Sequence, residues 1–284
     1  MKRRKRILLV AAAIICLAGI VEGRASLEAR LIFPGTVTQG RPDTVIPPGP
    51  GYELVHLTTP EGTAIVAQFG HALDTRGEPA ANPERRPTVI FFYGNGSCAA
   101  YMAGEFDRFR RLGARVLMPD FPGYGMSAGK PSEKGFYATA DAAYDYLLRR
   151  PDIDDNRIVA AGWSMGAAVA IDLASRRKVE GLVTVSAFTT LPAVAHSLVP
   201  WLPTSFIVRS RFDNVQEIAR VTCPIFMAHG SVDNLVPPEM VSALAAAAGR
   251  NVVIYRVAGG GHNDVFDVGG DALWGAIGAT IVAH

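Results

Sequence analysis

Between residues 88 and 257, short continuous runs of apolar residues alternate with longer stretches of helical periodicity. Runs such as TVIFFY at 88–93 and RIVAAG at 157–162 are typical of strands that are buried on both faces of a parallel sheet. Strands that alternate with helices are joined by right-handed crossovers, which place helices on both faces of the sheet. The sequence therefore predicts an α/β domain with a mostly parallel sheet.

Eight strands and five helices are expected from these patterns. The first two strands mix apolar and polar residues around a turn at 59–62, which predicts an antiparallel hairpin. The expected strands are residues 52–58, 63–69, 88–93, 115–119, 157–162, 181–186, 224–229 and 251–257. The expected helices lie near residues 99–112, 132–149, 166–177, 238–249 and 268–282.

The N-terminus has the pattern of a targeting segment. Five consecutive basic residues at 2–6 precede fifteen uncharged residues from Ile7 to Val21. This pattern predicts a signal peptide or membrane anchor over residues 1–23, with a buried helix as the structural alternative. The basic residues would stay in the cytoplasm, so we expect the domain on the non-cytoplasmic side of a membrane. Residues 24–51 hold five prolines and are expected to form a linker or strap before a domain at 52–284.

The charge distribution argues against nucleic-acid binding. The formal net charge is +2, but residues 1–23 carry five basic residues and one acidic residue. The remaining residues therefore have a net charge of −2, and no phosphate-binding face is expected. Three cysteines are too few for a disulfide scaffold, and metal-ligand clusters such as H-E-x-x-H are absent from the sequence.

The sequence G-W-S-M-G at 162–166 directly follows one predicted strand and precedes a predicted helix. This context is typical of a nucleophile elbow, in which a tight turn with small flanking residues exposes a serine above the sheet. Ser164 is the candidate nucleophile. The alternative is a glycine-rich turn with an uninvolved serine.

A serine nucleophile needs a histidine base, and the base needs a carboxylate that fixes its tautomer. Asp233 follows the strand at 224–229 and is the candidate acid, with Asp213 and Asp267 as competitors. His262 is the candidate base, because it follows the last predicted strand on a glycine-rich loop. The chain order Ser164, Asp233, His262 supports this combination.

An oxyanion hole is expected beside the nucleophile. Its first donor should be the backbone N–H of Met165, the residue after Ser164. The second should come from the loop after the strand at 88–93, where Asn95 is the preferred donor and Gly96 the next.

These motifs together resemble the α/β-hydrolase fold serine hydrolases, over about residues 52–284. The segments that show this resemblance are VIFFYGNGSCAAYM, MPDFPGYGMSAGKPSEKGFYATA and SFIVRSRFDNVQEIARVTCPIFMAHGSVDNLVP. The most similar branch is that of N-terminally membrane-anchored α/β-hydrolase-domain proteins with thioesterase-like and depalmitoylase-like members. The resemblance implies the fold, the triad and its chemistry, and it departs at Tyr93-Gly94, where the family usually has His-Gly.

Residues 189–214 form the sizeable insertion near the predicted active-site edge and contain many large apolar side chains. We expect a small cap over Ser164 that accommodates an acyl chain, or alternatively a segment that packs on the sheet. The predicted function is hydrolysis of carboxylic esters or thioesters of small or acyl-chain substrates by a monomer, without metal or cofactor. The alternatives are an aminopeptidase-like serine peptidase and a catalytically silent scaffold that binds a ligand at the membrane.

Overall fold

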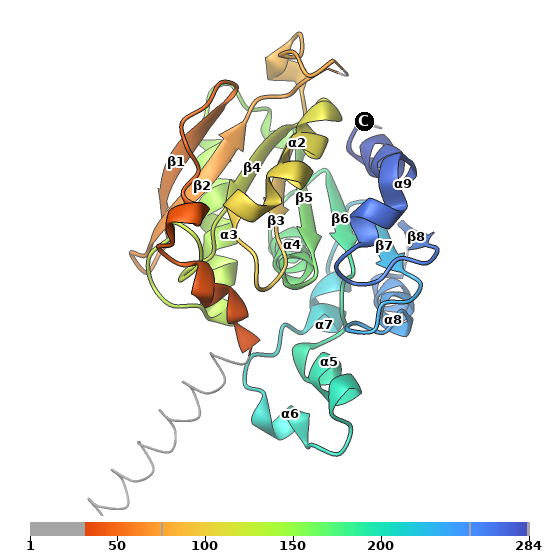
Figure 1. The fold of residues 1–284 in the computed structure, drawn as a ribbon. Coiled ribbons are helices and arrows are strands. Elements are labelled where there is room, and N and C mark those ends of the chain that lie inside the picture. Colours follow the sequence, from red (N-terminus) through yellow and green to blue (C-terminus); the bar gives the residue numbers. More distant parts are fainter. Residues whose placement is uncertain (1–31, 75, 250, 283–284) are drawn as a thin grey trace, which may run out of the picture. The chain divides into compact units, whose positions relative to one another are not determined.

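The structure, a computed structural model, describes residues 32–74, 76–249 and 251–282, and an eight-stranded sheet forms its centre (Figure 1). The strands are β1 (Tyr52–Thr58), β2 (Ala64–Gly70), β3 (Thr88–Phe92), β4 (Arg115–Pro119), β5 (Ile158–Trp163), β6 (Gly181–Val185), β7 (Ile225–Gly230) and β8 (Val252–Val257). Their order in the sheet is β1-β2-β4-β3-β5-β6-β7-β8. The strands β3 to β8 are parallel, and β2 pairs antiparallel with both β1 and β4. This architecture is the α/β-hydrolase fold, so the predicted fold class and the N-terminal hairpin are confirmed.

The α-helices lie in the connections between the strands. They are α2 (Ala103–Arg111), α3 (Glu133–Leu148), α4 (Met165–Arg176), α5 (Leu191–Leu198), α6 (Thr204–Ile207), α7 (Asn214–Ile218), α8 (Glu239–Ala248) and α9 (Val265–Val282). Short 3-10 helices are η1 (Pro34–Thr38), η2 (Pro42–Thr44), η3 (Pro83–Arg85), η4 (Ala99–Met102) and η5 (Asp155–Arg157).

Two groups of helices cover the sheet (Figure 1). In one group α3, α4, α7 and α8 contact one another in succession. In the other, α2 meets α9 through the edge-to-face rings of Phe109 and Trp274, whose centroids are 5.0 Å apart. Because helices cover both faces, every residue of β3, β4, β6 and β7 is buried. The edge strand β8 is covered less completely, and Val253 is 61% exposed.

The structure differs from the sequence prediction mainly at element ends. Strand bounds shift by a residue, the expected helix at 99–112 divides into η4 and α2, and the last helix begins at Val265. The short helices α5, α6 and α7 were not predicted, because helices of four to eight residues show too little of the 3.6-residue period.

The proline-rich segment before β1 contacts the loop after β4. The backbone N–H of Gly40 donates to the Gly125 carbonyl at 2.9 Å, and the Gly125 N–H donates to Thr38 Oγ1 at 3.0 Å. Gly35 lies flat against the Tyr124 ring, since a Cβ at this position would fall 1.9 Å from a ring carbon. Residues 35–44 are thereby attached to the domain.

The predicted targeting segment at 1–23 lies outside the described residues. Within residues 32–282, apart from 75 and 250, no helix has the length and apolar character needed to cross a membrane.

Candidate active site

Ser164 lies in the sharp turn between β5 and α4. Its φ is 55° and its ψ is −117°, a conformation that L residues rarely adopt. The turn is possible because both flanking positions are glycine: a Cβ on Gly162 would lie 2.1 Å from the Gly166 carbonyl oxygen, and one on Gly166 would lie 2.0 Å from that of Phe92. The sequence pattern G-x-S-x-G thus has a direct steric cause in this fold.

The three side chains predicted for the triad lie in hydrogen-bonding sequence. Ser164 Oγ is 2.8 Å from His262 Nε2, and His262 Nδ1 is 2.8 Å from Asp233 Oδ2. All three residues are buried, with Asp233 only 3% exposed. A serine, an imidazole and a carboxylate in this arrangement can pass a proton from Oγ to Nε2 while the carboxylate stabilises the imidazolium.

The turn after β7 fixes the Asp233 carboxylate. Its Oδ1 accepts the backbone N–H groups of Leu235 at 2.9 Å and Val236 at 2.8 Å, which leaves Oδ2 for His262. Burial raises the pKa of Asp233, but the hydrogen bonds from His262 and the two backbone N–H groups outweigh burial and place the pKa below its ordinary value. The carboxylate is therefore held in the charged form.

The glycine-rich loop after β8 lies directly against this turn. The Val232 N–H donates to the Gly260 carbonyl at 3.0 Å, and a Cβ on Gly230 would lie 2.3 Å from the same oxygen. Close backbone approach at Gly230 brings His262 within reach of both partners.

A second buried imidazole supports the acid turn. His229, at 1% exposure, lies with Nε2 3.0 Å from the Val236 carbonyl and 3.4 Å from Asp233 Oδ2. Burial lowers the pKa of His229, so the neutral ring donates its Nε2–H to the carbonyl. His229 lies in the strand predicted at 224–229, and its position in a strand gives no indication of this contact with the candidate acid.

Tyr93, which stands where the resemblance expects histidine, anchors the loop that carries Asn95. Its hydroxyl donates to Asp120 Oδ1 at 2.9 Å and accepts the Phe121 N–H at 3.1 Å, and both Tyr93 and Asp120 are fully buried. Asp120 also accepts the N–H groups of Ala99 at 2.7 Å and Met126 at 2.9 Å. Burial raises the pKa of Asp120. A phenol and a carboxylate thus connect the ends of β3 and β4.

The two predicted oxyanion donors lie on different elements, Met165 directly after the nucleophile and Asn95 in the loop after β3. Met165 is the first residue of α4. The amide side chain of Asn95 is occupied, because its Oδ1 accepts the Tyr124 hydroxyl at 2.7 Å. The expected contribution of Asn95 is its backbone N–H, and its role and that of Met165 remain predictions.

Trp163 forms an apolar wall beside the histidine. Its ring centroid is 5.9 Å from that of His262 and 6.1 Å from that of Phe266, and its indole N–H donates to the His262 carbonyl at 3.3 Å. Gly94 allows this packing, since a Cβ there would lie 2.8 Å from the indole. Trp163 therefore helps to position the backbone of His262.

The competing acids lie elsewhere. Asp213 is the N-cap of α7, where its Oδ1 accepts the Gln216 N–H at 3.4 Å, and Asp267 lies exposed in the first turn of α9. Among the described residues, no group of three or more His, Cys, Asp or Glu side chains could hold a metal ion.

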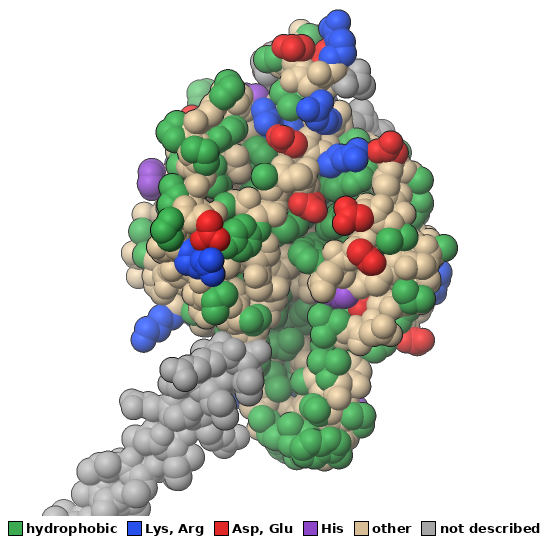
Figure 2. All heavy atoms as spheres, in the orientation of Figure 1, with side chains coloured by type: hydrophobic (Ala, Val, Ile, Leu, Met, Phe, Trp, Pro, Cys, Tyr) green, Lys and Arg blue, Asp and Glu red, His purple; other side chains and the backbone are tan. Residues whose placement is uncertain are grey.

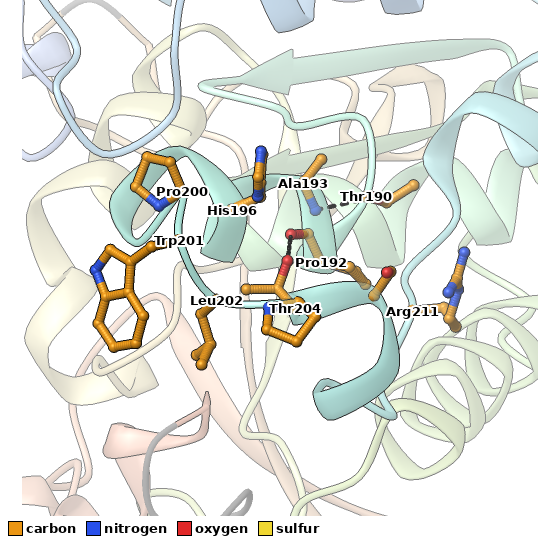
Figure 3. A pocket seen from close by; sticks show the side chains of 11 residues that line it. Thr190, Pro192, Ala193, His196, Pro200, Trp201, Leu202, Thr204 and Arg211 are labelled. Atoms are coloured by element: carbon orange, nitrogen blue, oxygen red, sulfur yellow. Dashed lines mark hydrogen bonds between the residues drawn. The ribbon is translucent and has the colours of Figure 1, made fainter.

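The insertion between β6 and α7, residues 189–213, contains α5 and α6 and a pocket of about 610 Å³ between them (Figure 3). The Thr204 hydroxyl donates to the Pro192 carbonyl at 2.9 Å and joins the two helices. Apolar side chains line the pocket together with His196 and Arg211, and none of Ser164, Asp233 and His262 does.

Comparisons with known proteins identify what this arrangement is similar to. A family model described as "Alpha/beta hydrolase family" matches residues 92–213. The alpha/beta hydrolase domain-containing protein WAV2 of Arabidopsis thaliana is 33% identical over 243 residues, which cover 78% of this chain and 76% of that protein. An uncharacterized protein of Mycobacterium tuberculosis is 32% identical over 265 residues, covering 93% of this chain and 90% of the relative.

Solved structures share the fold at lower identity. The Pyrococcus furiosus esterase Pf2001 superposes with a TM-score of 0.66 at 22% identity, over 81% of this chain and 89% of the esterase. The acetyl xylan esterase from Paenibacillus sp. R4 superposes with a TM-score of 0.67 at 16% identity, over 84% of this chain and 86% of that enzyme.

Proposed function

The chain belongs to the α/β-hydrolase family, and from that premise we propose that it is a serine hydrolase that cleaves carboxylic ester or thioester bonds. The observation that carries the proposal is the hydrogen-bonded sequence Ser164, His262, Asp233, with both hydrogen bonds at 2.8 Å. Family membership supports a hydrolase, and the two esterases of similar fold make esters the first substrate class to test.

The chemistry follows from these groups. Ser164 Oγ attacks the acyl carbonyl while His262 Nε2 takes its proton, and the Asp233 carboxylate stabilises the imidazolium. The backbone N–H groups of Met165 and Asn95 would stabilise the oxyanion. The tetrahedral intermediate collapses as His262 returns the proton to the leaving alcohol or thiol. Water then attacks the acyl carbon while His262 takes one of its protons. The second tetrahedral intermediate collapses as the bond to Ser164 Oγ breaks and His262 returns that proton to Oγ, which releases the carboxylic acid and restores the serine.

Labelling with a fluorophosphonate probe separates a working enzyme from a silent scaffold. We expect the intact protein to be labelled and Ser164→Ala to remain unlabelled. The matched control is Ser242→Ala, an exposed serine on α8 that contacts Arg256, which should be labelled like the wild type. Absence of labelling in the wild-type protein would contradict the proposal.

A substrate panel tests the bond type and the acyl group. We propose a preference for short to medium acyl chains, because the insertion offers apolar surface of limited extent. Each methylene that becomes buried is worth about 0.8 kcal/mol, roughly fourfold in affinity, so rates should rise with chain length and then level off. The panel comprises p-nitrophenyl esters, acyl thioesters and aminoacyl anilides. Faster cleavage of anilides than of esters would favour the aminopeptidase alternative instead.

We also propose that the domain acts on the non-cytoplasmic side of a membrane, as in the anchored, thioesterase-like branch. The support is the sequence of residues 1–23, in which five basic residues precede the uncharged run. A reporter that is active only in the cytoplasm, fused to the C-terminus, should give no signal. A strong signal would refute this location.

A further inference from the structure

The insertion between β6 and α7 ends in a cluster of exposed apolar side chains, which we name the apolar tip. The tip consists of Leu198, Trp201, Phe206 and Ile207, which are 52%, 81%, 84% and 40% exposed. Figure 2 shows hydrophobic side chains gathered at this end of the molecule. Large exposed aromatic side chains close together are unusual on a surface that faces only water.

The base of the insertion is fixed by hydrogen bonds, so the tip is held in place. Its two ends meet where the Leu191 N–H donates to the Arg211 carbonyl at 2.9 Å. The N–H groups of Arg211 and Phe212 each donate to the Glu133 carboxylate at 2.7 Å, which attaches the insertion to the start of α3. Phe212 is fully buried beneath. The apolar tip thus projects from an anchored base.

The charge of the insertion indicates what the tip contacts. From Gly181 to Phe212 the chain contains no aspartate or glutamate, and the exposed Arg209 and Arg211 follow the tip directly. Apolar and aromatic side chains bordered by arginine fit the interface of a bilayer with anionic lipid, where the rings enter the acyl boundary and the guanidinium groups meet phosphates.

We propose that the apolar tip docks on the surface of a bilayer that contains anionic lipid. A second copy of the chain would bring its own Arg209 and Arg211 into the contact, and the N-terminal segment would bring the basic residues 2–6. Anionic lipid carries a charge opposite to that of these arginines, whereas both other occupants add positive charge.

The proposed membrane anchor would favour this docking. The apolar run ends at Val21 and Gly35 packs against Tyr124 of the domain, so the residues between these two positions span at most about 45 Å when extended. A tether of this length keeps the domain at a high effective concentration near the bilayer.

Docking has a consequence for catalysis, which rests on the proposed function. The insertion leaves the sheet at the end of β6, next to the end of β5 that carries Ser164. A docked tip would therefore bring the active-site edge toward the bilayer and give it access to acyl substrates dissolved there. The docking itself does not depend on activity.

Quenching of tryptophan fluorescence by brominated lipid tests the docking with the full chain. The three tryptophans are Trp163, which is half-buried, Trp274, which is 5% exposed, and Trp201 in the tip. We expect vesicles of brominated phosphatidylcholine and phosphatidylserine to quench the wild type, and most of that quenching to disappear in Trp201→Phe. Equal quenching of both proteins would overturn the proposal.

Further variants separate apolar from electrostatic contributions. Phe206→Ser should reduce the quenching, whereas Val253→Ser, which changes an exposed valine on the edge strand β8, is the matched control and should leave it unchanged. Replacing Arg209 and Arg211 by glutamine should lower the ratio of docked to undocked protein about fivefold for each residue, on phosphatidylserine vesicles only. Equal docking of this double variant and the wild type on those vesicles would refute the electrostatic part.

Two controls identify the cause if the vesicles do not quench the tryptophan fluorescence. In the absence of vesicles, protection of Trp201 from quenching by iodide would overturn the proposal. Protection that depends on protein concentration would mean that a second copy covers the tip, and protection that does not would mean that the chain itself covers it. Hydrolysis of a p-nitrophenyl ester in vesicle-free buffer reports on the proposed function separately, since a loss there leaves the quenching of a docked protein intact.

Discussion

Replacing Asp233 by asparagine tests the proposed proton relay, because the substitution removes a charge and adds no volume. In the structure Oδ1 accepts two backbone N–H groups, from Leu235 at 2.9 Å and Val236 at 2.8 Å, while Oδ2 faces His262 Nδ1 at 2.8 Å. An asparagine in this position must turn its NH₂ group to one side or the other.

Each orientation of the amide has a definite cost. With the amide oxygen on the two backbone N–H groups, the NH₂ group faces His262 Nδ1, which must then accept. The imidazole proton moves to Nε2, where it donates to Ser164 and prevents that nitrogen from acting as a base. The flipped amide restores the correct tautomer but loses two hydrogen bonds of about 2 kcal/mol each, so about 4 kcal/mol disfavours it roughly a thousandfold.

Loss of the negative charge beside the imidazolium adds to this penalty. We therefore expect kcat of Asp233→Asn to fall about 10⁴-fold, the size of the effect of the corresponding change in a serine protease. Hydrolysis of a p-nitrophenyl ester at saturating concentration measures kcat, and circular dichroism verifies the fold.

The matched controls are the competing acids. Asp213→Asn retains an oxygen that can cap α7, and Asp267→Asn alters an exposed side chain, so both should stay within about threefold of the wild type. A rate of Asp233→Asn within tenfold of the wild type, or a larger loss in either control, would refute the relay.

Three further predictions concern the residues that support the site. Tyr93→Phe should lower the free energy of unfolding by about 3 kcal/mol in a urea titration, because it leaves the buried Phe121 N–H unpaired and removes a donor to a carboxylate. Gly166→Ala should abolish soluble folded protein, since the new Cβ would lie 2.0 Å from the Phe92 carbonyl oxygen. The control is Gly104→Ala on α2, where a Cβ would meet open space, and this change should leave the stability unaltered or raise it by up to about 1 kcal/mol. Burial places the pKa of His229 below its ordinary value of about 6.5, so the unfolded chain binds the proton more readily than the folded chain. The free energy of unfolding of the wild type should therefore fall as the pH is lowered from about 7 to about 5. His229→Gln should weaken this dependence, and identical pH profiles of the variant and the wild type would contradict the prediction.

The strands and the order of the candidate triad could be predicted because both depend on burial and topology. A strand covered on both faces, such as β3 or β5, needs a continuous apolar run, and the run marks its limits to within a residue. Parallel strands end at one edge of the sheet, so polar residues just after β5, β7 and β8 must come close together.

The supporting contacts could not be predicted, because they join residues from different strands through side chains. Tyr93 and Asp120 follow β3 and β4, and nothing in either segment specifies a hydrogen bond across 27 positions. The signal was present in another form, since both residues, like His229, are polar groups at the end of a continuous apolar run. A polar group that such a run carries into the core must find a partner there, because an unpaired one would cost about 1–3 kcal/mol. Polar residues that end buried strands therefore indicate the wall of a site as well as its reacting groups, and in this chain they fix the loop that follows β3 and the turn that carries Asp233.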